Sequence, residues 1–378
     1  MKNLKKWMAI LLSLAMVLAM FAGCGQDGTQ TPASDGAEPG NADAASGDIY
    51  IPVIAKGFQH QFWQNVGKGA EAAAQELGVT INFMGPTSES EIAAQLDMIS
   101  AELNKNPSAI CLAALDSEAV TSQLLQAQEN GIPVIGFDSG VPNAPEGTIA
   151  ATAATNSYEG AAMAAEKMFE AEQFAENLKK ATADHPVLIS VQAQDVTSSS
   201  IVARTTGFCD KMKELCETVF PGGVAITGFD KFNQECAGDM VVEINITIPP
   251  TTSTADSQSA MQAVLQKSNL IAIFGTDEGK SNAVLAATSD GQDLDRENGK
   301  YKDVIFVGFD AGSTQKQAVR NQWIYGSVAQ DSFQIGYQAV DLAVKAISGE
   351  TVSDIDTGCV FYTHENIDDP EIADLLYD

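Results

Sequence analysis

Short apolar runs and segments of helical periodicity alternate along most of this chain, and this alternation limits the fold more than any other feature. Residues 49–55 are apolar, residues 62–77 carry apolar side chains at helical spacing, and residues 79–83 form the next apolar run. Strands that are apolar throughout are typical of parallel sheets covered on both faces, so the sequence predicts a doubly wound α/β fold. Residues 219–240 are the least regular stretch and predict an extended loop or insertion. Further strands are expected at 109–114, 134–137, 148–153, 187–191, 241–246, 270–274, 304–309 and 326–329, with helices near 92–103, 117–130, 200–217, 256–267, 279–288 and 334–348.

The length of the chain predicts two lobes. It has 378 residues, and the part from residue 48 onward exceeds what one hydrophobic core usually supports. Two similar segments, 134–140 and 306–312, each place an aspartate between glycine-rich turns after a buried strand, Asp138 and Asp310. Ligands of open α/β sheets bind beyond the carboxyl ends of strands. We therefore expect both aspartates to face one cleft between the lobes; the alternative is that each is a turn or helix-capping residue.

The beginning of the chain predicts export. Three lysines precede an apolar segment at 7–21, which is shorter than a membrane span, and small residues then lead to Cys24. This end resembles a bacterial lipobox, which implies a signal peptide at 1–23 and a diacylated Cys24 that anchors the protein outside the cytoplasmic membrane. An ordinary secretory signal with a free Cys24 is the alternative. Residues 24–47 contain no aromatic and no basic residue, and they predict a flexible tether.

Charge and motif content exclude several functions. The formal net charge of −29 argues against binding to nucleic acid, where affinity depends on phosphate neutralisation, and against electrostatic docking on anionic lipid. No nucleophile elbow, phosphate loop or zinc-protease motif is present, so we expect neither an enzyme nor a cofactor or metal site. Cys111 lies in an apolar strand and is expected to be a buried thiol. Cys209 and Cys216 are too far apart along a helix to pair, whereas pairing of Cys216 with Cys236 stays open.

Polar and aromatic residues follow several predicted strands, as a cleft for a polyhydroxylated ligand requires. Phe62 and Trp63 are adjacent at a helix start, so at least one is expected to face the cleft, with core packing as the alternative. Arg204 lies near another helix start, and a surface role is its alternative. The candidates in such positions, besides the two aspartates, are Lys56, His60, Phe62, Trp63, Arg204, Asp277 and Gln330.

In these segments the chain resembles the periplasmic sugar-binding proteins of the ribose-binding type, the substrate-binding components of ABC importers. The resemblance covers about residues 48–378, and its motifs occur in the order found in that family. They are the segment ending Phe62-Trp63, then Gly131-Ile132-Pro133-Val134-Ile135 leading to Asp138, Arg204-x-x-Gly207-Phe208, Phe274-Gly275-Thr276-Asp277-Glu278, Val307-Gly308-Phe309-Asp310, and Ala329-Gln330 before Gln334-Ile335-Gly336.

The resemblance implies a monomeric, lipid-anchored protein on the outer face of the cytoplasmic membrane that captures a monosaccharide or related polyol and delivers it to an ABC permease. It implies one lobe from 48–154 with 331–359 and another from 155–330 with 360–378. The chain would cross between them near Ala154, Gln330 and Cys359. The ligand shell that it implies is His60, Phe62, Trp63, Asp138, Arg204, Asp277, Asp310 and Gln330, to which Lys56 is added because it matches a ligand-contacting lysine of the autoinducer-2-binding branch.

Three departures from the ribose-binding pattern bear on the ligand. His60, Ser139 and Asp277 stand where the ribose binder has asparagine, arginine and asparagine, so the resemblance does not imply ribose itself. Two alternatives stay open: a sensor that presents a sugar or autoinducer-2 to a signalling receptor, and a nucleoside-binding lipoprotein.

Overall fold

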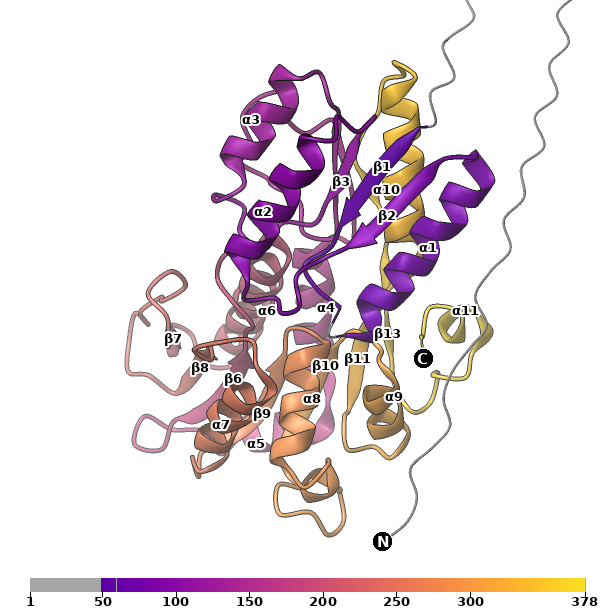
Figure 1. Cartoon of the computed structure of the whole chain (residues 1–378). Helices are drawn as coiled ribbons and strands as arrows, with labels where there is room; N and C mark the ends of the chain where they lie inside the picture. Colours follow the sequence, from indigo (N-terminus) through magenta and orange to yellow (C-terminus); the bar gives the residue numbers. More distant parts are fainter. Residues whose placement is uncertain (1–48, 59, 378) are drawn as a thin grey trace, which may run out of the picture. The chain divides into compact units, whose positions relative to one another are not determined.

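The computed structural model describes residues 49–58 and 60–377 (Figure 1). The predicted signal peptide, the tether and the acylation site Cys24 lie outside the described residues. The described part folds into two α/β lobes, each built on its own sheet. This confirms the predicted fold class.

The first lobe has a parallel sheet in the order β12-β5-β4-β3-β1-β2. Two buried clusters cover its faces, one under α1 and α10 and the other under α2 and α3. Its strands are β1 (Tyr50–Ile54), β2 (Thr80–Met84), β3 (Ile110–Leu112), β4 (Val134–Phe137), β5 (Ala151–Ala154) and β12 (Ile355–Asp356), and its helices are α1 (Gln61–Leu77), α2 (Ile92–Leu103), α3 (Thr121–Glu129) and α10 (Ser332–Ile347).

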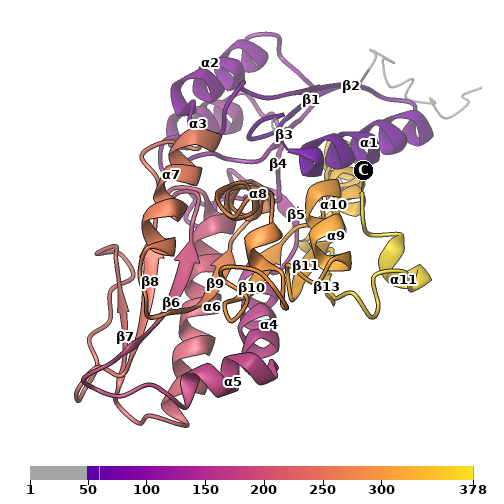
Figure 2. The same ribbon diagram turned by 90° about the horizontal axis from the view of Figure 1, so that it is seen from below.

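The second lobe has a sheet in the order β13-β11-β10-β9-β6-β8-β7, parallel except where β13 pairs antiparallel with β11. Figure 2 shows α4 and α6 on one side of these strands and α8 on the other. Its strands are β6 (Val187–Gln192), β7 (Val224–Thr227), β8 (Val242–Thr247), β9 (Leu270–Gly275), β10 (Ile305–Phe309), β11 (Gly326–Gln330) and β13 (Cys359–Tyr362); its helices are α4 (Ser157–Glu170), α5 (Glu172–Leu178), α6 (Ser199–Glu217), α7 (Thr254–Leu265), α8 (Glu278–Ala287), α9 (Ser313–Arg320) and, near the end of the chain, α11 (Pro370–Ala373).

Within the described residues, the chain passes between the sheets at three places. It leaves the first sheet after β5, returns after β11 with α10, which packs on β3, β4 and β5, and leaves again between β12 and β13. Cys359, which the sequence analysis placed at the end of the first lobe, pairs with Gln330 in the second sheet. Neither lobe is therefore a single continuous segment of the chain.

Each lobe contains a pair of helices whose backbones touch, α1 with α10 and α4 with α6 (Figure 1). A Cβ atom on Gly336 of α10 would lie 1.9 Å from the carbonyl oxygen of Val66, and one on Gly207 of α6 would lie 2.2 Å from that of Tyr158. No side chain fits at such distances, so glycine is required at both contacts. Both glycines belong to motifs that carry the family resemblance.

The structure corrects the sequence interpretation in two regions. Residues 219–240 are not a loop throughout, because Val224–Thr227 forms β7, which pairs in parallel with β8 at the edge of the second sheet. Residues 157–178, for which no helix was predicted, form α4 and α5. The buried face of α4 consists largely of alanine and glycine, so its apolar periodicity is weak.

The cysteines of the described residues are all free, including Cys216 and Cys236, whose pairing the sequence left open. Cys111 is fully buried in β3, as predicted, and its thiol donates to the carbonyl oxygen of Ala339 at 3.3 Å. Burial raises the pKa of Cys216 to about 12, so this thiol stays protonated at neutral pH.

Candidate ligand-binding cleft

Asp138 and Asp310 occupy equivalent positions in the two lobes. Each directly follows a buried strand, β4 or β10, and each has a positive φ angle, 50° for Asp138 and 75° for Asp310. The backbone N–H of each donates to the neighbouring strand, to Ala153 O at 3.0 Å and to Val328 O at 2.7 Å. Aspartate tolerates this left-handed conformation better than most residues. The internal similarity read from the sequence is thus also a similarity of backbone geometry.

Arg204 lies between the two aspartates. It projects from α6, with Nη2 at 3.7 Å from Asp138 Oδ1 and Nη1 at 3.8 Å from Asp310 Oδ2. Nη1 also donates to Thr276 O at 3.1 Å, and the guanidinium carbon lies 4.0 Å from the ring centre of Phe309. Arg204 is buried, so the surface alternative for this residue is wrong. The ionic pairs that it makes with the two carboxylates are longer than hydrogen bonds.

Lys56 provides a second cation on the first-lobe side. It follows β1 and is buried, with Nζ at 3.8 Å from Asp138 Oδ2 and 3.6 Å from Glu89 Oε2. Burial alone would lower the pKa of the Lys56 ammonium, but Glu89 and Asp138 outweigh this and raise it. Lys56 is therefore charged at neutral pH.

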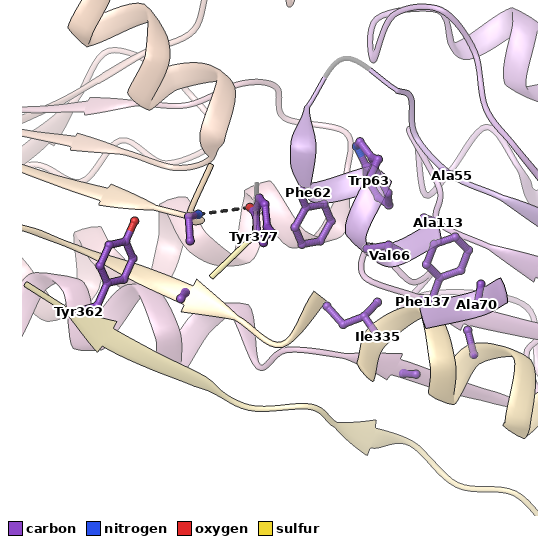
Figure 3. Close-up of a cluster of buried hydrophobic side chains, with 14 of the residues drawn as sticks. Ala55, Phe62, Trp63, Val66, Ala70, Ala113, Phe137, Ile335, Tyr362 and Tyr377 are labelled. Carbon is purple, nitrogen blue, oxygen red and sulfur yellow. Dashed lines mark hydrogen bonds between the residues drawn. The ribbon is translucent and has the colours of Figure 1, made fainter. Parts of the chain in front are cut away.

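Phe62 and Trp63 both belong to the core cluster and both line the cavity next to these charges. Figure 3 shows the two rings beside each other, with Phe137 and Tyr377 nearby; their centroids are 4.9 Å apart in an edge-to-face arrangement. The Trp63 Nε1 donates to Glu89 Oε1 at 2.8 Å. Both alternatives posed from the sequence therefore hold for this pair, because the two rings line the cleft and also pack in the core.

His60 precedes α1 and makes no side-chain cap for it. Its Nε2 lies 3.7 Å from Glu89 Oε1. This places His60 on the same side of the cavity as Lys56 and Trp63, with part of the imidazole open to solvent.

The second-lobe side holds a network around Asp310. Gln330 Nε2 donates to Asp310 Oδ1 at 2.6 Å, and the backbone N–H of Glu278 donates to Asp310 Oδ2 at 2.9 Å. The Oε1 of Gln330 is buried without a hydrogen-bond partner. Asp277 differs from Asp310, because its oxygens accept from Lys280 N and Thr276 Oγ1 inside the same lobe, where it caps α8.

Every ligand-binding residue predicted from the sequence lines one cavity between the lobes. The space open to the centre of a water-sized sphere is about 20 Å³, room for roughly one water molecule. The lining residues are Lys56, His60, Phe62, Trp63, Asp138, Arg204, Asp277, Asp310 and Gln330, together with Glu89, Gln194, Ile201 and Glu278.

Sequence reasoning missed the last four residues, and for the three polar ones the reason is identifiable. Glu89 lies in the polar loop after β2, where carboxylates are common in so acidic a chain. Gln194 follows β6 just as Gln330 ends β11, and that strand-end position was an available signal. Glu278 was read as part of a motif without a role of its own.

The carboxylates of the cavity differ in their pKa shifts. Burial raises the pKa of Asp138 against the opposing effects of Lys56 and Arg204, and it raises the pKa of Asp310 against that of Arg204. Burial also raises the pKa of Glu278, where nearby Asp310 adds to the effect. Burial would raise the pKa of Glu89 too, but Lys56 and His60 and the hydrogen bonds that Glu89 accepts outweigh it and lower the pKa. Glu89 is therefore the carboxylate that holds its charge most firmly, whereas at the two aspartates Lys56 and Arg204 only partly oppose the effect of burial.

A second, larger hollow of about 680 Å³ adjoins the cavity and shares Asp138 with it. The segment 140–158 forms most of its wall, and no lysine or arginine lines it. We place the site in the smaller cavity, because the paired charges and the aromatic rings converge there.

No cluster of histidine, cysteine and acidic side chains suited to a metal ion occurs among residues 49–58 and 60–377. Across the same residues, no helix combines the length and the apolar character that crossing a membrane requires.

Comparison with known proteins agrees with this geometry. Residues 51–351 match the family of the periplasmic binding protein domain. The chain belongs to this family. It is 24% identical over 315 residues to the ribose import binding protein RbsB of Haemophilus influenzae, covering 82% of this chain and 90% of that protein. A shorter match, 30% identical over 86 residues, to the D-allose-binding periplasmic protein of Escherichia coli covers 23% of this chain and 28% of that protein.

Solved structures are similar over most of this chain. A protein from Brachyspira murdochii described as an ABC transporter, LacI family transcriptional regulator, has a TM-score of 0.72 and 38% identity, covering 88% of this chain and 99% of that one. An ABC transporter solute-binding protein from Agrobacterium vitis with bound D-fucose has a TM-score of 0.70 and 28% identity, covering 87% and 100%. This family consists of substrate-binding proteins of transporters, not of enzymes.

Proposed function

We propose that this protein captures a monosaccharide or related polyol in the cleft and delivers it to the permease of an ABC importer. The observation that carries the proposal is the position of Arg204 between Asp138 and Asp310, in a cavity that both lobes line. Carboxylates accept hydrogen bonds from sugar hydroxyls, and a guanidinium donates to their oxygens. Family membership and the D-fucose bound by the Agrobacterium vitis relative support the same ligand class.

The lengths of the ionic pairs support a ligand that sits among these charges. Arg204 stands 3.7 and 3.8 Å from the two aspartates, and Lys56 stands 3.8 Å from Asp138. At these separations the groups attract one another but keep donors and acceptors free for hydroxyl groups. The aromatic rings of Phe62 and Trp63 line the same cavity and offer the apolar surface that the C–H groups of a sugar ring need.

Ligand entry requires the lobes to separate. With about 20 Å³ open to water-sized spheres, the cavity is too small for a sugar ring as the lobes stand here, so they must open for entry and close less tightly around bound sugar. Three chain crossings join the lobes and provide the hinge. Sugar that contacts Asp138 on one lobe and Arg204 and Asp310 on the other favours the closed form, because an open form cannot make all these contacts at once. The closed form then docks on the permease.

The anchor and the location belong to the same proposal. Acylation of Cys24 holds the protein on the outer face of the cytoplasmic membrane, and residues 25–47 let it reach the permease. Radiolabelled palmitate incorporated into the wild-type chain, and lost in Cys24→Ser, tests the acylation site. Label retained in the variant contradicts it.

A thermal-shift screen tests the ligand class. The chain carrying Cys24→Ser is heated with pentoses, hexoses, polyols and nucleosides, each at millimolar concentration. A sugar at a hundredfold its Kd adds about 2.7 kcal/mol to the free energy of unfolding and raises the Tm. A response to nucleosides alone, or to no compound of the set, overturns the proposal.

A further inference from the structure

Glu89 joins the polar side chains on the first-lobe side of the cavity. Its carboxylate is buried, with 5% of the residue exposed. Oε1 accepts from Trp63 Nε1 at 2.8 Å, and Oε2 lies 3.6 Å from Lys56 Nζ. Oε2 also accepts from Gln194 Nε2 of the second lobe at 2.9 Å. One side chain therefore contacts a cation, an aromatic ring and the opposite lobe.

The contact with Trp63 fixes the orientation of its ring. The residue is 1% exposed, and a buried indole N–H without an acceptor would be destabilising. Phe62 packs edge-to-face against the same ring. Glu89 therefore sets the aromatic surface that the cavity presents.

The contact with Lys56 keeps a charge in a buried site. Lys56 faces Glu89, Asp138, the more distant Asp195 and, unfavourably, Arg204. Asp138 is shared between Lys56 and Arg204, so Glu89 is the neighbouring carboxylate that Lys56 does not share with Arg204. Removing one partner of a buried ion pair leaves an uncompensated charge.

We propose that Glu89 is a positioning residue of the sugar site, which holds Lys56 charged and Trp63 oriented and which pairs with Gln194 when the lobes close. This role rests on the proposed sugar-binding function. Glu89 acts through Lys56 and Trp63, so its loss alters how the site behaves and not only how well the lobe folds.

Calorimetry on the full-length chain tests the role, with D-ribose, D-allose, D-fucose, D-arabinose and D-tagatose as probes. The probe that binds the wild type is titrated between pH 6 and pH 9. We expect a constant affinity in the wild type. In Glu89→Gln we expect about tenfold weaker binding at pH 6 and a further loss toward pH 9, because Lys56 without its Glu89 partner gives up its proton more readily. Glu89→Asp keeps the charge and is expected to bind weakly with a flat profile.

A matched control comes from the same loop. Glu91 is exposed and accepts from Thr87 and Ser88, so Glu91→Gln removes one charge without reaching the cavity. Its affinity and pH profile should equal those of the wild type. Wild-type affinity in Glu89→Gln, or a loss that is the same at every pH, overturns the positioning role.

The fluorescence emission of Trp63 tests the role of Glu89 without any sugar. Subtracting the spectrum of Trp63→Phe isolates this ring from Trp7 and Trp323. Its emission should shift in Glu89→Gln, because the charged acceptor of the indole is gone, and should not shift in Glu91→Gln. Failure of all five sugars to bind the wild type counts against the proposed function alone; unchanged Trp63 emission in Glu89→Gln counts against the role of Glu89.

Discussion

The backbone N–H of Phe62 donates to Glu278 Oε2 at 3.1 Å, so a carboxylate of the second lobe caps the first helix of the first lobe. Glu278 Oε1 accepts from Gln61 N at 3.3 Å. In the opposite direction, Gln61 Oε1 accepts from the N–H and the hydroxyl of Ser313 at 2.8 and 3.0 Å, at the start of α9. Neither α1 nor α9 is capped by the side chain of its own N-cap residue. The two lobes thus exchange helix caps.

Removing one of these interlobe helix caps should weaken sugar binding, although the substituted residue does not contact the sugar. Gln61→Ala removes the acceptor for Ser313, and capping contacts contribute roughly 0.5 to 1 kcal/mol at an accessible site. Because the contact exists only with the lobes together, we expect two- to fivefold weaker affinity by calorimetry. Gln64→Ala, an exposed position on the same helix, is the control and should bind like the wild type. Equal affinities for both variants would contradict a cap that favours closure.

Removing the central charges should abolish binding. Asp310→Ala deletes an acceptor that sugar hydroxyls need and leaves Arg204 with one carboxylate partner fewer. We expect affinity to fall by more than a hundredfold in calorimetry, while circular dichroism shows the wild-type helix content. Arg204→Lys keeps a cation but loses the planar fork, and we expect at least tenfold weaker binding. Retained affinity in either variant refutes the assignment of the site.

Acidification should weaken sugar binding. The pKa values of Asp138, Asp310 and Glu278 are raised by burial, so these groups take up protons above the usual carboxyl range near pH 4. A protonated carboxyl accepts hydroxyl hydrogen bonds less well, so the affinity measured by calorimetry should fall as the pH is lowered from 6 toward 4.

The effect of these groups on folding has the opposite sign. A carboxyl whose pKa is higher in the folded state binds protons more readily when folded, so its cost to stability is present at neutral pH and is relieved as the pH falls through the folded-state pKa. Asp310→Asn should therefore lower the pH dependence of the Tm between pH 4 and 7. A steeper dependence in this variant would show that the sign is wrong.

The glycine contacts between helices should be intolerant of any side chain. In Gly207→Ala and Gly336→Ala the new methyl group meets backbone at 2.2 and 1.9 Å. Overpacking typically costs 1–3 kcal/mol, and backbone cannot rotate away as a side chain can, so we expect about 3 kcal/mol lower free energy of unfolding in urea titrations. Gly238→Ala is the control, since a Cβ atom on Gly238 would lie 3.5 Å from its nearest neighbour and the φ angle of Gly238 is not positive.

Much of this architecture can be read from the sequence, because it depends on local patterns. Apolar runs and helical spacing predicted most strands and helices, and the strand-end positions of Asp138 and Asp310 predicted that they share a cleft. The alanine-rich helix α4 was not predicted, because small residues give little apolar periodicity. Two interlobe contacts, Glu89 with Gln194 and Gln61 with Ser313, were not predicted for another reason. Each joins segments that are far apart in the chain, and only the docking of the lobes brings them together.

The passage of the chain between the lobes also bears on how the protein is made. The first lobe lacks α10, and with it the helix that packs on β3, β4 and β5, until residues 332–347 have left the ribosome. A nascent chain therefore cannot complete its amino-terminal core early. Such a delay suits a polypeptide that has to remain unfolded until a translocation channel has taken it up.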